Sequence, residues 1–146
     1  MHEQKFLDIQ YAYGRIAIKQ HQGEMAMKPL EWIGRSLEDL RAFPTDVQHE
    51  IGQALTVAQY GGKHPAAKPL RGFGGAQVLE VVEDYHGDTY RAVYTVRFVE
   101  VLYVLHCFQK KSTRGIKTTQ RDVEMIKARL RLAQEEYDRW RKARQQ

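Results

Sequence analysis

The sequence has almost no cysteine and no long apolar run, and each absence excludes a class of protein. Its single cysteine, Cys107, cannot form a disulfide within the chain. A disulfide-stabilised secreted fold is therefore excluded, and a reducing compartment such as the cytoplasm is expected. No apolar run approaches the roughly 18–20 residues that a membrane-spanning helix needs. The first residues carry both charge signs and lead into no apolar segment, so we expect no signal peptide.

The residues that build metal centres, phosphate-binding loops and serine nucleophiles are also scarce or badly spaced. Six histidines and Cys107 are scattered without an HExxH or paired Cys/His spacing, so we expect no metal site. His106 and Cys107 are neighbours in a predicted strand and should point to opposite faces of its sheet. The glycine-rich run 71–75 lacks a following Lys-Ser/Thr pair, which excludes a P-loop. Serine occurs only at Ser36 and Ser112.

What the sequence does have is a localised positive charge. Its 146 residues, 42% of them hydrophobic, are enough for one domain with a sizeable core. The formal net charge is +5, from 23 Lys and Arg against 18 Asp and Glu. Residues 1–26 are neutral, whereas residues 110–131 hold eight Lys or Arg against Asp122 and Glu124. Positive charge concentrated in this way favours an acidic partner such as nucleic acid.

A compact pattern begins at Met27, and it suggests where the domain starts. We expect residues 1–26 to be an N-terminal extension, either flexible or derived from an upstream start codon, before one domain over residues 27–146. The alternative is that residues 1–26 form the first helix of the domain, although Gly14 weakens such a helix. No internal repeat and no Pro- or Ser-rich linker divides the chain.

Hydrophobic periodicity predicts an α+β domain. The expected elements are a strand at 30–33, a helical hairpin at 36–60, a loop at 63–75, strands at 78–82, 89–98 and 101–108, and a helix that starts after 118–119 and runs beyond 140. The three later strands form an antiparallel meander on which the helices pack. The last of them is apolar throughout, so we expect it to be covered on both faces. Ser36 is expected to cap the first helix, and Thr45 with Gln48 to form a capping box for the second.

Cations gather near the predicted sheet. They come from four segments: Lys68 and Arg71 from the loop, Arg91 and Arg97 from one face of the second meander strand, Lys110 and Lys111 from the end of the third, and Lys117 and Arg121 from the start of the last helix. Adjacent antiparallel strands can bring Arg91, Lys110 and the loop into one patch. Such a patch suits a phosphate backbone, which arginine clamps with forked hydrogen bonds. Crowded cations also lower the pKa of a lysine, as a general base requires.

Each cation also has an interpretation without a function. The lysines within residues 110–117, taken singly, are ordinary solvated charges, and Arg97 fits an edge strand protected from aggregation. Arg91 is different, because a charge within an otherwise apolar strand needs a partner. Glu80, one strand away, is the expected partner.

Four segments of the chain are the most distinctive. They are 68–75 (KPLRGFGG), 78–80 (VLE), 87–94 (GDTYRAVY) and 105–112 (LHCFQKKS). Together they resemble the RelE/ParE toxin superfamily, most closely its phage-derived HigB-type branch, over residues 28–133. The resemblance implies a RelE-like fold, in which a small antiparallel sheet carries an N-terminal helical hairpin and a C-terminal helix. It also implies the toxin of a type II toxin–antitoxin system.

The resemblance further implies an endoribonuclease that cuts mRNA on the ribosome without a metal or another cofactor. A ribose 2′-OH would attack the adjacent phosphate. By matching position, the implied catalytic residues are Lys68, Arg71, Arg91, Lys110 and Lys111. Arg91 would stabilise the transition-state charge, Lys68 or Lys110 would be the general base, and Arg71 and Lys111 would hold RNA. The residues expected to add RNA contacts are Arg97, Arg114, Lys117 and Arg121.

The sequence departs from the superfamily at two places. Residues 80–82 read EVV where many relatives have Glu-Leu-Arg, and Phe108 ends the strand where several ribosome-dependent relatives carry a catalytic Tyr or His. Two alternatives therefore stay open: a ParE-like toxin that inhibits DNA gyrase, and a basic nucleic-acid-binding module. The expected partners are a helix-turn-helix antitoxin, in a toxin–antitoxin hetero-oligomer, and mRNA on the ribosome. No membrane is expected among them.

Overall fold

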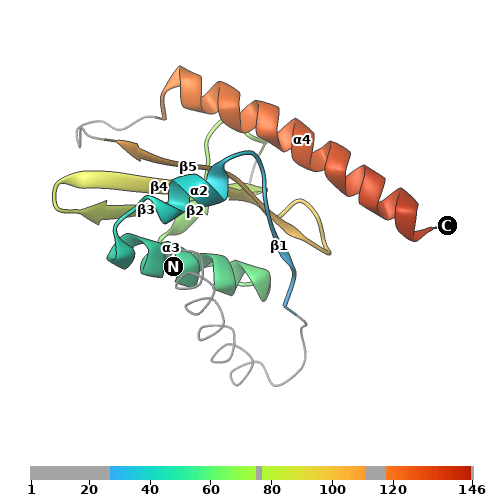
Figure 1. The fold of residues 1–146 in the computed structure, drawn as a ribbon, viewed down its shortest axis with the longest axis horizontal. Coiled ribbons are helices and arrows are strands. Elements are labelled where there is room, and N and C mark those ends of the chain that lie inside the picture. Colours follow the sequence, from blue (N-terminus) through green and yellow to red (C-terminus); the bar gives the residue numbers. More distant parts are fainter. Residues whose placement is uncertain (1–26, 75–76, 111–117, 146) are drawn as a thin grey trace.

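The computed structural model describes residues 27–74, 77–110 and 118–145 (Figure 1). The expectations for the extension at 1–26 and for Lys111, Arg114 and Lys117 lie outside these described residues. Among the helices that are described, none is long and apolar enough to cross a lipid bilayer.

The described residues form strands and helices in the predicted α+β order. The elements are β1 (Leu30–Trp32), α2 (Ser36–Arg41), α3 (Thr45–Gln59), β2 (Ala67–Pro69), β3 (Val78–Tyr85), β4 (Asp88–Thr95), β5 (Leu102–Lys110) and α4 (Gln120–Arg144). The predicted helical hairpin, the three later strands and the long last helix are all present. The prediction of a loop over residues 63–75 is wrong in part, because β2 lies within it.

All five strands belong to one sheet, in the order β1-β5-β4-β3-β2. β3, β4 and β5 pair antiparallel and form the predicted meander. β2 pairs antiparallel with β3 at one edge. β1 pairs with β5 in parallel, so the sheet is mixed at its other edge rather than wholly antiparallel.

A two-residue turn sets the register of β3 and β4. His86 and Gly87 both have positive φ, 50° and 85°, which is the conformation of a type I′ hairpin turn. Tyr85 therefore pairs with Asp88, and the pairing continues in register along both strands. Because side chains alternate between the two faces of a strand, this register decides which charged residues share a face.

The sheet separates two hydrophobic cores. α2 and α3 cover one face, where the core includes Leu40, Ile51 and Leu102. α4 covers the other face, where the core includes Leu105 and Ile126. Figure 1 shows α3 and α4 on opposite sides of the sheet. β5 is buried from both sides over most of its length, which confirms the prediction made from its apolar sequence.

β5 contains a bulge that changes the direction of its side chains. The register shifts between Val93 and Tyr94 of β4, which leaves Leu105 as an extra residue in β5. Leu105 and His106 both point towards α4 as a result, the first into the core and the second in a hydrogen bond to the helix. Cys107 returns to the α3 side, so the prediction that His106 and Cys107 face opposite ways is confirmed.

Of the predicted helix caps, one is right and two are wrong. Thr119 caps α4 by accepting a hydrogen bond from a backbone N–H of the first turn. Ser36 instead begins α2, and its buried hydroxyl donates to a backbone carbonyl of β5. Gln48 donates to the carbonyls of Arg41 and Phe43 and forms no capping box. Both side chains bond to backbone carbonyls outside their own helix turn, and a cap pattern read along one helix does not predict such bonds.

Arg129 of α4 contacts both β5 and the turn that follows β1. Its guanidinium donates a 2.9 Å hydrogen bond to the carbonyl of Leu105 in the bulge. It also lies against Gly34, in the turn between β1 and α2, where a Cβ atom would be 3.0 Å from the guanidinium. Gly34 has φ +59°, so both its backbone and its close neighbour require a glycine.

We expect Gly34→Ala to lower the free energy of unfolding by about 2–3 kcal/mol. The left-handed backbone costs roughly 1–2 kcal/mol, and displacing Arg129 removes a hydrogen bond worth about 1 kcal/mol. Gly87→Ala is the matched control, because Gly87 has φ +85° but nothing within 4 Å of the added Cβ. Urea denaturation measures both variants. Equal losses would show that the contact with Arg129 contributes nothing.

Candidate functional site

The α4 side of the sheet carries a row of polar side chains across three neighbouring strands. The register places Lys68 of β2 opposite Glu80 of β3, and Glu80 opposite Val93 of β4. Arg91 comes two residues before Val93 and therefore lies on the same face. Phe108 of β5 lies opposite Arg91. Strand pairing thus brings two cations and one carboxylate together on an otherwise apolar face.

Glu80 and Arg91 form a buried ion pair, which confirms the partner predicted from the sequence. Arg91 Nη1 donates a 2.9 Å hydrogen bond to Glu80 Oε2, and each residue is only 5% exposed. Charges buried to this extent are stable only when they are paired and hydrogen-bonded. The same nitrogen lies 3.5 Å from the hydroxyl of Thr118, just before α4. The pair therefore joins β3, β4 and the approach to the last helix.

Lys68 forms the outer end of this network. Its Nζ lies 3.8 Å from Glu80 Oε1, and its side chain is 62% exposed. Lys68 was expected in a loop, but it belongs to β2, and the pairing of β2 with β3 fixes its position. Glu80 consequently lies between an exposed ammonium group and a buried guanidinium group.

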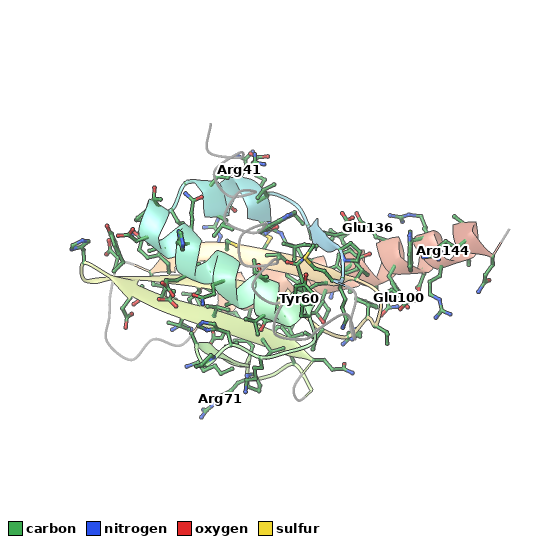
Figure 2. The ribbon with its side chains drawn as sticks, turned by 90° about the horizontal axis from the view of Figure 1, so that it is seen from below. Arg41, Tyr60, Arg71, Glu100, Glu136 and Arg144 are labelled. Atoms are coloured by element: carbon green, nitrogen blue, oxygen red, sulfur yellow. The ribbon has the colours of Figure 1, made fainter. Side chains whose placement is uncertain are left out.

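A hollow of about 580 Å³ opens over the network. The described residues that line it are Lys68, Pro69, Leu70, Arg71, Glu80, Arg91, Thr118 and Val123. The volume is within the range of sites that hold small ligands or parts of larger ones. Arg71 lies at the rim, where Figure 2 shows its side chain pointing away from the body. With three cations and one carboxylate, the lining is positively charged.

Lys110, the last residue of β5, lies near the network. By the alternation of the strand, Lys110 is on the same face as Phe108 and His106. Burial lowers the pKa of Lys110, and the positive charge of Arg91 lowers it further. Asp122 and Glu80 act in the opposite direction, but the pKa stays below its usual range. Lys110 thus releases its proton more readily than an ordinary lysine.

A second network joins the start of α4 to β5 through His106, Asp122 and Arg129. Arg129 Nη1 can only donate, so His106 Nδ1, at 3.2 Å, accepts, and Nε2 donates to Asp122 Oδ1 at 2.9 Å. Burial alone raises the pKa of Asp122, but hydrogen bonds from Thr119 and His106 outweigh it and lower the pKa. This network was not predicted from the sequence. The local signal was Asp122 at the third position of a helix capped by Thr119.

The structure does not bring all the predicted site residues together. β4 ends at Thr95, and Arg97 beyond it donates a 3.2 Å hydrogen bond to the side chain of Gln77. Six residues of extended chain, roughly 20 Å, separate Arg97 from Arg91. Arg97 thus lies beyond the end of β4, and the prediction that it shares a strand face with Arg91 is wrong. Arg121 is exposed in the first turn of α4 and does not line the hollow.

The chemistry of the hollow suits an anion with several oxygens. Glu80 orients the Arg91 guanidinium, whose forked donors match a phosphate group. Lys68 and Arg71 add charge along the rim, where a second phosphate of an extended ligand would lie. In the ranges that the structure describes, no three His, Cys, Asp or Glu side chains are close enough to hold a metal ion.

One known protein family matches more than half of the chain. The family model described as phage-derived protein Gp49-like (DUF891) matches residues 38–131. The match runs from α2 to the middle of α4 and includes every described residue that lines the hollow. A search among curated proteins finds no match.

Removing one member of the buried ion pair should destabilise the fold more than replacing both. We expect Arg91→Ala to lower the free energy of unfolding by about 3–5 kcal/mol, because it leaves the Glu80 carboxylate buried without its main partner. The double variant Glu80→Gln/Arg91→Met has no charge at either position, so its free energy of unfolding should decrease less than that of Arg91→Ala. Urea denaturation compares the two. A double variant that is the less stable of the two would contradict this account of the pair.

Because the pKa of Asp122 is lowered, the free energy of unfolding should decrease at acidic pH. A carboxyl whose pKa is lowered on folding stabilises the fold above its unfolded pKa, about 3.9, and this contribution is lost as the pH falls through the folded pKa. We expect Asp122→Asn to cost about 1 kcal/mol at pH 7, the order of one hydrogen bond. It should also flatten the decline of stability below pH 5. Urea denaturation from pH 7 to pH 3 measures this, with Glu135→Gln, exposed on the same helix, as the control.

Proposed function

The chain belongs to the phage-derived Gp49-like family, a RelE-like toxin family of toxin–antitoxin systems, and from this premise we propose that it is a HigB-type toxin. We propose that it cleaves mRNA on the ribosome, without a metal or another cofactor, and that a cognate antitoxin neutralises it. The proposal takes residues 27–146 as the toxin domain. The observation that carries it is the buried Arg91–Glu80 pair, which presents a fixed guanidinium to a positively charged hollow.

The proposed reaction is a transesterification within the RNA. The ribose 2′-oxygen bonds to the adjacent phosphorus, the bond from phosphorus to the 5′-oxygen breaks, and a 2′,3′-cyclic phosphate remains. Negative charge grows on the phosphoryl oxygens in the transition state. Arg91 would stabilise this charge, and because Glu80 already orients its guanidinium, little reorganisation would be needed during the reaction.

One proton must leave the 2′-hydroxyl and another must reach the 5′-oxygen. The sequence left Lys68 and Lys110 open as the base. We assign the base to Lys110, which lies diagonally across from Arg91 on the same face of the sheet. Burial and the charge of Arg91 also lower its pKa, which is the direction that favours a base. Lys68 is exposed and lies 3.8 Å from Glu80, and we assign it as the ammonium that donates to the leaving 5′-oxygen. The proton taken up by Lys110 and the one released by Lys68 balance the reaction.

The remaining cations are proposed to hold the RNA strand. Arg71, which lines the hollow, and Lys111, the residue that follows Lys110 in the sequence, would contact phosphates next to the reacting one. The further RNA contacts proposed from the sequence are Arg97, Arg114, Lys117 and Arg121. Among these, Arg97 does not line the hollow, so its contact would be with another part of the substrate.

The test is to induce variants in growing bacteria and map RNA 5′ ends. We expect the unaltered chain to stop growth and to leave transcript cuts in phase with codons. Arg91→Lys keeps a charge beside Glu80 but loses the forked donors, and Lys110→Met loses the base. Each should reduce cleavage about a hundredfold or more. Lys127→Met is the matched control, because it removes one exposed charge from α4 outside the hollow.

Three results would contradict this proposal. Cleavage by Arg91→Lys and Lys110→Met at the rate of Lys127→Met would remove these residues from the reaction. Growth arrest with intact transcripts and a DNA-damage response would favour a gyrase inhibitor. Normal growth on induction of the unaltered chain would favour a nucleic-acid-binding module without toxicity.

A further inference from the structure

α4 is longer than the sheet that it covers. Its 25 residues span about 37 Å. The helix packs on the sheet as far as Tyr137, the last of its buried residues in the described chain. Beyond Tyr137 it extends past the sheet, towards the C-terminus in Figure 1. We refer to residues 138–145 as the overhang.

The core-facing stripe of α4 continues into the overhang. Ile126, Ala133 and Tyr137 are buried, and spacings of three, four and seven residues place Trp140, Arg141 and Arg144 on the same side of the helix. Along the sheet, this side of α4 carries buried apolar side chains. In the overhang, the same side of the helix carries Trp140, Arg141 and Arg144 in their place.

Contacts with Tyr137 hold this end of the helix in place. The Tyr137 ring lies 4.4 Å from Phe98, centroid to centroid, and its hydroxyl donates a 2.7 Å hydrogen bond to Glu100. Trp140 lies 5.9 Å from Tyr137, and the Arg144 guanidinium lies 4.8 Å above the Trp140 ring. Trp140 is 36% exposed. The exposed rings and guanidinium groups are thus ordered before any partner arrives.

Two hollows flank Trp140. One, of about 330 Å³, has apolar walls from Pro29, Val101 and Tyr103, with Glu31, Glu136 and Arg139 around it. The other, of about 240 Å³, is lined by Glu100 and the two arginines of the stripe. Figure 2 shows Glu136, Glu100 and Arg144 gathered at this end of α4. An apolar hollow beside an exposed tryptophan is the composition typical of a protein-binding surface.

We propose that the overhang and its two hollows are the docking surface for the antitoxin, an inference that rests on the proposed function. The partner segment places an apolar side chain in the hollow beside Trp140 and a carboxylate against Arg141 and Arg144. The two hollows are lined by three glutamates and three arginines, and this balance of charge suits a polypeptide of mixed charge better than a run of phosphates. The charges therefore favour a protein over RNA here.

The overhang lies outside the part of the chain that matches the family, whereas Glu100, Val101 and Tyr103 of the two hollows lie within it. The family match ends at residue 131, before Trp140 and both arginines. The hollow with Arg91 lies near the start of α4, and the overhang is at the opposite end of that helix. The family fold thus supplies the candidate reaction site, and the added helical turns supply recognition of the chain's own partner.

The test uses the full chain and the purified product of the adjoining reading frame, in isothermal titration calorimetry. We expect Trp140→Ala and Arg144→Glu each to weaken binding about thirtyfold or more, as for residues at the centre of an interface. Lys142→Glu is the matched control. It makes the same charge change two residues away, on the opposite side of the helix and in neither hollow, and it should bind like the unaltered chain.

The outcomes separate this inference from the proposed function. If the unaltered chain and both variants bind equally, the docking surface is wrong while the toxin–antitoxin pairing stands. If the unaltered chain does not bind the product at all, both the pairing and the docking surface fail, whereas RNA cleavage is tested separately. Weaker binding of a labelled RNA hairpin by the variants, with antitoxin binding unchanged, would show that the surface serves RNA. Circular dichroism confirms that each variant keeps its helix.

Discussion

A buried arginine in the middle of a sheet is tolerated only when a carboxylate neutralises it, and the site depends on this constraint. Arg91 and Glu80 lie on different strands, so their pairing requires one register of β3 against β4. The type I′ turn supplies that register. A slip of one residue would move Arg91 to the other face of the sheet and leave two buried charges without partners. The turn and the ion pair therefore favour the same register of β3 against β4.

The sequence was sufficient to predict the parts of the site that depend on alternation within a strand. Arg91 stands out in an apolar strand, and Glu80 is the carboxylate that an antiparallel neighbour brings near. β2 could not be predicted in this way, because Ala67, Lys68 and Pro69 are too few to show a period of two and include a proline. Such a short strand forms only because the edge of β3 offers partners for its backbone.

The contacts of His106 show a different limit. The bulge adds Leu105 to β5, so the alternation seen before it does not continue after it. The partners of His106, Asp122 and Arg129, are 16 and 23 residues away, so the sequence around His106 does not predict them. The wrong caps have the same cause, since Ser36 and Gln48 use their side chains to join separate elements. Local patterns therefore predicted the elements well and predicted the links between elements poorly.

These links explain how one helix can serve two purposes. Asp122 and Arg129 bind the first half of α4 to β5, and Tyr137 packs the next turn against Phe98. A partner on the overhang can move the start of α4 only by breaking these contacts together. A partner that binds the overhang without moving α4 leaves the hollow beside Arg91 open. If an antitoxin binds the overhang as proposed, it would inhibit either by extending along α4 to the hollow or by keeping the whole domain from its substrate.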